Sequence, residues 1–307
     1  MSIASTGPAL ERAYAECRII ARREAKNFYY AFVALPEPRR NAICAIYAFM
    51  RQADDLSDDE SIARQERRKR LDAWLNNWRA VCHGGDSSNL VFVAVRDAVE
   101  RYSIPLSLLD ELVAGVTMDL EHDASGEPDT YATFAELYRY CYLVASVVGL
   151  VCIRIFGYSD ARAEKFAEET GIAFQLTNIL RDVAEDAARN RVYLPLEDLT
   201  AHGIALNALL RRKASASPSA DERALLAEIA QRAENYYQSA DKLLPLIDRE
   251  SRPALRVLVS IYHALLKRIE RADYDVFTQR VSVPTAQKLS ILAVGLMRMG
   301  LARLGIG

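Results

Sequence analysis

The chain has few of the residues that interrupt regular structure, with only 13 glycines and 10 prolines among 307 residues. Long regular elements should therefore dominate it. It also lacks an excess of charge of either sign, because 39 basic and 41 acidic residues leave a formal net charge of −2. This balance argues against a general attraction to nucleic acid or to an anionic membrane surface. A strongly anionic ligand must therefore be held by local basic clusters or by bound cations.

Cysteine is scarce as well. The five cysteines, at positions 17, 44, 82, 141 and 152, are odd in number and form no CxxC pair, and the four histidines lack zinc-ligand spacing. We therefore expect free thiols in a reducing compartment. The first residues lack a basic segment followed by an apolar one, so we expect no signal peptide and a cytoplasmic protein.

Strand patterns are nearly absent, and helical periodicity runs through almost the whole chain. It predicts one or two helices over about residues 7–34, which Leu35 and Pro36 end, and a further helix that begins near Pro38. Turn formers at 83–89, 123–129 and 213–220 are too short to be interdomain linkers. We expect a single all-α domain over residues 1–307, with further helices over about 60–82, 88–102, 106–121, 131–157, 160–188, 220–247, 252–273 and 285–304.

One stretch of 14 residues, Tyr140–Ile153, carries no charge and lies between two arginines. A helix that spans a bilayer needs about 20 such residues, so the stretch predicts a buried central helix. Ala145, Ser146 and Gly149 would let a neighbouring helix or a ligand approach it closely. The pattern is compatible with ordinary helix packing and with the wall of a cavity.

Two acidic clusters stand out, because each has two aspartates four residues apart: Asp54 with Asp58, and Asp182 with Asp186. On a helix this spacing places both carboxylates on one face, where like charges cost about 0.2–0.5 kcal/mol. Two such pairs beside apolar segments indicate a compensating cation. Mg²⁺ fits, since it is usually held by one or two carboxylates together with phosphate oxygens and water.

Arginines flank both clusters. Arg51, Arg181 and Arg191 could bind phosphate oxygens in a forked geometry. The alternative is that both clusters are solvated helix faces, with Arg181 paired to Glu185 one turn away. The spacing alone does not name a substrate.

Longer motifs resemble a known family. The segments are KNFY (26–29) with LP (35–36), AIYAFMRQADDLSD (45–58), YCYLVASVVG (140–149), and QLTNILRDVAED (175–186) continuing to RVYLP (191–195). In this order and at these spacings they are similar to the motifs of squalene and phytoene synthases. The resemblance covers about residues 15–282.

The resemblance implies an all-α, type I isoprenoid synthase bundle around a central cavity, with Mg²⁺ ions between two facing aspartate motifs. Carried over position by position, it implies these roles: metal ligands Asp54, Asp58, Asn178, Asp182 and Asp186; diphosphate-binding residues Lys26, Arg51, Asn178, Arg181, Arg191, Tyr262 and Arg280; Tyr140 and Gln175 beside the reacting carbons; and Phe28, Val144, Ala145 and Leu176 along an isoprenoid channel.

The implied reaction is the head-to-head joining of two prenyl diphosphates through a cyclopropyl diphosphate. We favour farnesyl diphosphate as the substrate, giving presqualene diphosphate or squalene, with NADPH used only if the reductive step occurs. The close alternative is phytoene synthase acting on geranylgeranyl diphosphate. A terpene cyclase shares the fold but is not expected to carry the Tyr140 and Arg191 motifs, and a non-catalytic isoprenoid-binding helical protein is the alternative of another class.

The chain departs from the family pattern in places. Ser146 stands where glycine is usual, the link at 121–130 is longer than expected, and 275–279 carries one extra residue, which leaves the assignment of Arg280 open. The apolar C-terminal segment Leu289–Ile306 contains three basic residues if Lys288 is included. It predicts either a helix packed on the domain or an interfacial helix in peripheral contact with a membrane. We expect no nucleic acid and no obligate protein partner.

Overall fold

The computed structural model describes the chain except for residues 1–6, 58, 60, 123–127, 213–215 and 304–307. Its helices are α1 (Gly7–Glu24), α2 (Lys26–Val33), α3 (Glu37–Ser57), α4 (Arg64–Cys82), α5 (Leu90–Tyr102), α6 (Leu106–His122), α7 (Phe134–Cys141), the π-helical turn η1 (Tyr142–Ser146), α8 (Val147–Phe156), α9 (Arg162–Ala188), α10 (Leu196–Ala201), α11 (Leu206–Leu210), α12 (Ala220–Leu243), the 3₁₀ turn η2 (Leu244–Leu246), α13 (Arg252–Arg271) and α14 (Thr285–Arg303).

The predicted turn segments do separate helices, and two of them contain the N-cap residue of the helix that follows. The side chain of Asn89 accepts a hydrogen bond from the Val91 amide at the start of α5. Ser219 and Glu222 form a capping box at the start of α12. Such caps satisfy amide groups that have no partner inside the helix. The short helices α10 and α11 and a two-residue parallel ladder were not predicted; in that ladder β1 (Asp129–Thr130) pairs with β2 (Arg191–Val192).

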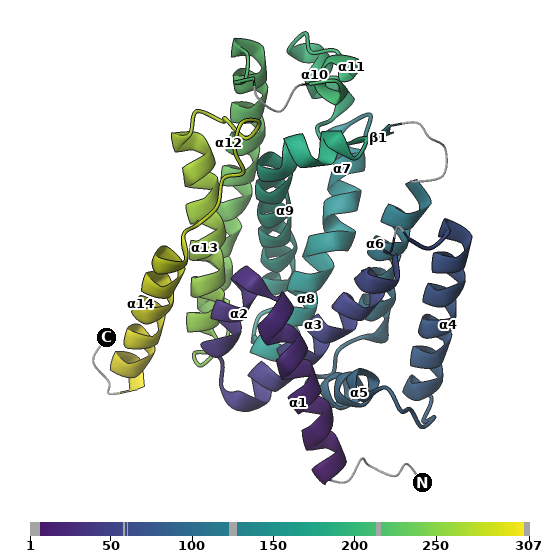
Figure 1. Ribbon diagram of the computed structural model, residues 1–307. Helices are drawn as coiled ribbons and strands as arrows, with labels where there is room; N and C mark the ends of the chain where they lie inside the picture. Colours follow the sequence, from purple (N-terminus) through teal and green to yellow (C-terminus); the bar gives the residue numbers. More distant parts are fainter. Residues whose placement is uncertain (1–6, 58, 60, 123–127, 213–215, 304–307) are drawn as a thin grey trace.

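Helix α9 runs through the middle of the bundle, where α12 packs on one side and the continuous run α7–η1–α8 on another (Figure 1). Gly171 permits the close approach of α9 to η1. A Cβ atom at Gly171 would lie 2.6 Å from the Cα atom of Ser146 and 3.0 Å from the carbonyl carbon of Ala145. The Ser146 hydroxyl donates a hydrogen bond of 2.7 Å to the Glu168 carbonyl of α9. The serine that replaces the usual glycine is thus used to join the two helices.

The charge-free stretch Tyr140–Ile153 is buried or half-buried at every residue, as expected of a central helix. The continuous helix Phe134–Phe156 is long and apolar enough to cross a membrane, but half of the apolar window is buried inside the protein. Its middle is the π turn η1, which accommodates one more residue than an α-helical turn. Such turns are frequent at functional sites.

The core has two large hydrophobic clusters. The first gathers side chains of α1, α3, α4, α5 and α8, and includes Phe49, whose ring packs against Trp74 and Phe92. The second gathers side chains of α9, α12 and α13 together with the segment around β2. Phe28 of α2 packs against both clusters. The first acidic motif, on α3, therefore lies beside the first cluster, and the second, at the end of α9, lies beside the second cluster. Helix α2 lies where the two clusters meet.

Helix α14 lies along α13 and α2 at one side of the molecule (Figure 1). Leu289, Val294 and Met297 remain exposed on its outer surface, and these are three of the six large apolar side chains that are exposed in the described part of the chain. This packing confirms the prediction of a terminal helix packed on the domain. The exposed apolar face leaves membrane contact as a prediction.

Candidate active site

The second acidic motif lies on the last turns of α9. Asp182 is only 17% exposed, and it is bound by two arginines. Arg181 Nε donates to Asp182 Oδ1 over 2.8 Å, and Arg280 donates to the same carboxylate over 2.9 Å. Arg280 also pairs with Glu185 over 3.2 Å. The structure thus brings Arg280 to the second motif across 98 residues of sequence. Its role in binding diphosphate stays a prediction.

Asp186 lies on the same helix face, where its charge is unfavourable. Burial raises the pKa of its carboxyl to about 7, and the neighbouring charges of Asp182 and Glu185 act in the same direction. Arg191 and Arg189 oppose this rise only in part. The predicted repulsion between aspartates one turn apart is therefore present, and a nearby cation would relieve it.

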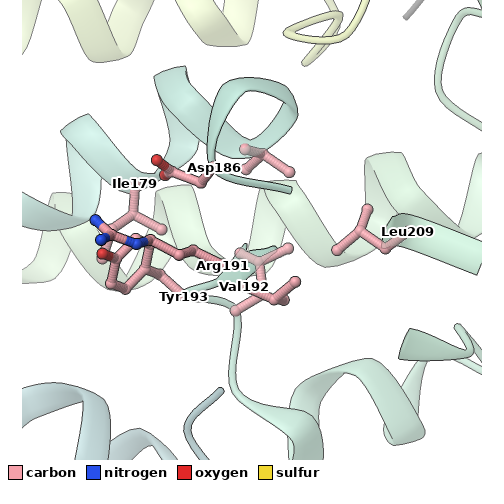
Figure 2. Close-up of a pocket in the computed structure, with 8 residues that line it drawn as sticks. Ile179, Asp186, Arg191, Val192, Tyr193 and Leu209 are labelled. Atoms are coloured by element: carbon pink, nitrogen blue, oxygen red, sulfur yellow. The ribbon is translucent and has the colours of Figure 1, made fainter. Parts of the chain in front are cut away.

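Arg191 is placed beside Asp186 by the turn that ends α9. Asn190 adopts a left-handed conformation (φ 61°), which asparagine tolerates better than most residues. Strand β2 then pairs with β1, so the long link before Tyr131 ends as a partner of the Arg191 segment. Figure 2 shows a small cavity here, with room for about one water molecule, in which Asp186 and Arg191 lie on one side and Leu209 at the other end.

Asn178 and Gln175 occupy the preceding turn of α9. The Asn178 amide donates to Gln175 Oε1 over 3.3 Å and lies within hydrogen-bonding reach of the Tyr262 phenol. The Asn178 Oδ1 atom is buried and has no hydrogen-bond partner among the described residues. Burial raises the pKa of Tyr262 to about 12, so this phenol is neutral at ordinary pH and can donate a hydrogen bond.

The first acidic motif lies at the C-terminal end of α3. Arg51 forms an ion pair of 2.6 Å with Asp55, one turn away. The charges of Asp54 and of Glu24 at the end of α1 also raise the pKa of Arg51. Asp54 is half-buried. Asp58 lies outside the described residues, so its place opposite Asp54 stays a prediction.

Aromatic side chains of α2 connect the two motifs. Phe28 packs on Tyr262 of α13, with ring centroids 5.6 Å apart, while Phe32 packs edge-on against Tyr47 of α3 at 6.0 Å. The charges of Arg181 and Asp182 act on the pKa of Tyr262, and those of Arg51 and Asp54 act on the pKa of Tyr47. Tyr262 and Tyr47 also interact electrostatically with each other. Both motifs therefore face the same region of the molecule.

The residues present fit a divalent cation. In the described part of the chain, no group of three His, Cys, Asp or Glu side chains could hold a metal ion unaided. Mg²⁺ normally needs only one or two carboxylates and takes its other oxygens from phosphate and water. Such an ion would accept the unpartnered Asn178 oxygen as a ligand and would stabilise the unfavourable negative charge of Asp186. The assignment of Asp54, Asp58, Asn178, Asp182 and Asp186 as ligands remains a prediction.

Beside these polar groups lies a stack of tyrosines. Tyr140 is 5% exposed, and its ring is nearly parallel to that of Tyr193, with centroids 4.9 Å apart. Tyr131 packs on both rings, at 5.5 and 5.9 Å. The three aromatic faces come from three segments that meet near β1 and β2. Their position next to Arg191 is consistent with the predicted role of Tyr140 near reacting carbons.

The predicted channel residues are distributed over three elements. Val144 and Ala145 lie on η1 and are half-buried, as is Phe28. Leu176 is fully buried within the second cluster. Their roles as channel walls remain predictions. Of Lys26 the structure describes the backbone at the start of α2 and not the side chain.

Three residues have contacts in this region that were not predicted from the sequence. Phe174 stacks on Tyr262, with centroids 4.5 Å apart and an angle of 20° between the rings. Glu185 binds Arg280. Lys288, which we had placed with the interfacial helix, has its pKa lowered by burial and by the positive charge of Arg181. It therefore lies near the second motif, which only the folded chain reveals.

Comparison with known proteins agrees with this arrangement. The chain matches the squalene/phytoene synthase family over residues 21–287. It is 35% identical over 287 residues to the phytoene synthase of Mycobacterium tuberculosis, covering 94% of this chain and 91% of the relative. It is 34% identical over 303 residues to the 15-cis-phytoene synthase of Synechococcus elongatus, covering 94% of each.

Solved structures give the same result. A dehydrosqualene synthase with a bound ligand matches with a TM-score of 0.81 and 28% identity over 95% of this chain and 98% of its own. A squalene synthase of Alicyclobacillus acidocaldarius matches with a TM-score of 0.77 and 25% identity over 90% of this chain and 99% of its own. The molecule is a prenyltransferase with the all-helical isoprenoid synthase fold. It belongs to the squalene/phytoene synthase family.

Proposed function

We propose that this protein joins two molecules of geranylgeranyl diphosphate head to head and forms phytoene. The observation that carries this choice is the pattern of relatedness: the phytoene synthases compared are 32–35% identical over at least 93% of the chain, whereas the two squalene-type structures described above are 28% and 25% identical. This reverses our preference from the sequence for farnesyl diphosphate. The farnesyl-using reaction, to presqualene diphosphate or squalene, becomes the second candidate, and the fold similarity to the squalene-type enzymes supports it.

The diphosphate ends would bind between the two acidic motifs. Mg²⁺ held there by Asp182, Asp186, Asn178 and Asp54 would neutralise the diphosphate oxygens and make the group a better leaving group. Arg181 and Arg280 bind the Asp182 carboxylate in this structure. If Asp182 bound a cation instead, the same guanidinium N–H groups would be free to bind the diphosphate. A forked guanidinium binds phosphate oxygens in the same way as carboxylate oxygens, so both arginines can change partner without moving far.

The carbon skeletons would react over the tyrosine stack. Loss of the first diphosphate leaves an allylic cation, which the double bond of the second substrate attacks, and loss of a proton closes a cyclopropane ring. Electron-rich ring faces stabilise cationic carbon by about 0.5–2 kcal/mol. Tyr140 and Tyr193 present such faces and are at most 7% exposed, which keeps water from the cation.

The second ionisation needs no reductant when phytoene is the product. Two twenty-carbon chains lose two diphosphate ions and two protons in all, and the electrons that remain form the central double bond. NADPH would be required only for squalene, in which a hydride replaces the second proton loss. The proposed product thus predicts turnover without a nicotinamide.

The test is incubation of the protein with Mg²⁺ and either prenyl diphosphate, with and without NADPH, followed by product analysis. We expect a forty-carbon hydrocarbon from geranylgeranyl diphosphate, with no effect of NADPH, and loss of turnover in EDTA that Mg²⁺ restores. Exclusive use of farnesyl diphosphate would select the second candidate. No condensation of either substrate would refute both.

A further inference from the structure

A second cavity lies outside the acidic centre, at the C-terminal end of α13. Its volume is about 410 Å³, within the usual range of ligand sites of about 300–1,000 Å³. Its lining residues lie on and just after the last turn of α13 and in residues 279–282. Figure 1 shows the chain after α13 running back along this helix to α14. Among the described residues, the charged side chains that line it are those of Arg268, Arg271 and Arg280, and no carboxylate is among them. We call this cavity the arginine vestibule.

Two of these arginines have no carboxylate beside them. Neither Arg268 nor Arg271 forms an ion pair in the described part of the chain, whereas Arg212 and Arg232 are neutralised by Glu222 and Asp198. The vestibule therefore holds two positive charges that no carboxylate in the described part of the chain compensates, and an oxygen-rich anion would compensate them.

Arg280 connects the vestibule to the acidic centre. Its guanidinium binds Asp182 and Glu185 on one side, yet the same side chain lines the cavity and is 57% exposed. An anion that leaves the second aspartate motif would therefore meet Arg280 first and then Arg268 and Arg271. The polar side chains of Gln279 and Ser282 add further donors along the wall.

We propose that the arginine vestibule binds inorganic diphosphate on its way out of the acidic centre. This inference rests on the proposed function, because head-to-head condensation releases two diphosphate ions for each product. The lining favours the free ion over the diphosphate group of a prenyl substrate. Among the described lining residues, the apolar side chains are those of Ala272 and Val281, which offer too little apolar surface to bind an isoprenyl chain. A multiply charged ion in a site with three guanidinium groups is matched in charge and in hydrogen-bond geometry.

The test is calorimetric binding of inorganic diphosphate to the full chain in EDTA, so that metal-dependent binding is removed. We expect the variant Arg268→Gln/Arg271→Gln to bind at least about tenfold more weakly than the wild type, since each lost charged hydrogen bond is worth about that factor. Arg256→Gln is the matched control, because Arg256 is an exposed arginine of the same helix outside the cavity. It should bind inorganic diphosphate like the wild type. Arg268→Gln/Arg271→Lys should recover part of the affinity that Arg268→Gln/Arg271→Gln loses.

Equal affinities in the wild type and the double variant, or no binding to a wild type that is folded by circular dichroism, would overturn the proposal. A second arm uses geranylgeranyl diphosphate in EDTA. If it binds more tightly than the inorganic ion and loses affinity equally in the double variant, the vestibule receives substrate and the assignment to the leaving ion is wrong. Because these two binding measurements involve no turnover, failure of the proposed function would appear in the product assay, and failure of the vestibule would appear in the binding measurements.

A kinetic arm separates exit from chance binding. Product inhibition by inorganic diphosphate should weaken in the double variant, while the initial rate in the absence of added diphosphate changes less than the inhibition constant. Unchanged inhibition together with unchanged binding would leave Arg268 and Arg271 as ordinary charges at a helix C-terminus.

Discussion

Replacement of Gly171 by alanine tests the packing that positions the active site. The added Cβ atom would lie 2.6 and 2.8 Å from the Cα and N atoms of Ser146, whereas ordinary contacts begin near 3.4 Å. Because both are backbone atoms, no side-chain rotation can relieve the overlap, and α9 and η1 must separate by roughly 0.8 Å. Overpacking of this kind costs about 1–3 kcal/mol, and the better helix propensity of alanine returns up to about 1 kcal/mol.

We therefore expect Gly171→Ala to lower Tm by roughly 2–6 °C, since about 1 kcal/mol corresponds to 2–4 °C in a domain somewhat smaller than this one. The effect on turnover should be larger. Val144 and Ala145 on η1 would move relative to Gln175, one turn beyond Gly171 on α9, and a 1 Å misplacement can cost about a hundredfold in rate. Thermal unfolding by circular dichroism and steady-state assays measure the two effects.

The control is Gly7→Ala, because a Cβ atom at Gly7 meets nothing within 4 Å. It should keep both Tm and activity. If Gly171→Ala were as stable and as active as the control, the two helices could separate without cost, and the argument from backbone contact would be wrong.

Three further predictions concern charge and surface. Asp182→Asn should keep the fold but lower turnover at least about a hundredfold and weaken activation in a Mg²⁺ titration, because several kcal/mol of metal-assisted charge stabilisation are lost; unchanged turnover would contradict the ligand assignment. Lys288→Met should raise the KM for the prenyl diphosphate by about tenfold, as expected for a lost charged contact, with kcat little changed, whereas Lys165→Met on the surface should not; equal KM values would exclude Lys288 from the site. Leu289→Asp/Met297→Asp should reduce co-sedimentation with vesicles of anionic lipid without affecting Tm, and identical sedimentation would dismiss membrane contact through α14.

Much of the fold could be predicted from the sequence because the helices are long, strongly periodic and separated by clear turn formers. The predicted span 160–188 compares with α9 at Arg162–Ala188, and the predicted span 106–121 with α6 at Leu106–His122. The parallel ladder of β1 and β2 has only two residues in each strand, so it has no periodicity to detect. The π turn at Tyr142–Ser146 has an ordinary helical composition and was equally invisible.

The candidate site could be predicted as far as its motifs extend. The spacing of Asp182 and Asp186 predicted a shared helix face, and the raised pKa of Asp186 agrees with it. The pairing of Arg181 could not be foreseen: the alternative we had considered was Glu185, one turn away, and the structure pairs it with the adjacent Asp182. Lys288 had no local signal either, because its approach to Arg181 depends on how α14 folds back along α13.

Substrate choice was the weakest inference from the sequence. The two aspartate motifs are predicted to act on the diphosphate, which is the same in farnesyl and geranylgeranyl substrates, so they carry no information about chain length. Chain length would be read by apolar side chains, and those of Val144 and Ala145 on η1 are predicted to be among them. Their effect depends on packing distances that a sequence does not contain. The relatedness to phytoene synthases supplies the preference that the motifs could not.

The π turn has a consequence for how this protein can change during evolution. A π turn takes up one extra residue by widening the helix locally, so loss of one residue from Tyr142–Ser146 would return the segment to a regular α-helix with its two halves nearly in place. Elsewhere in Phe134–Phe156 an α-helix advances by about 100° per residue, and a one-residue insertion or deletion would rotate the two halves against each other by about that angle. Tyr140 could then keep its stack on Tyr193, or α8 its packing on α9, but not both. The π turn is therefore the point at which this helix should tolerate the loss of one residue best.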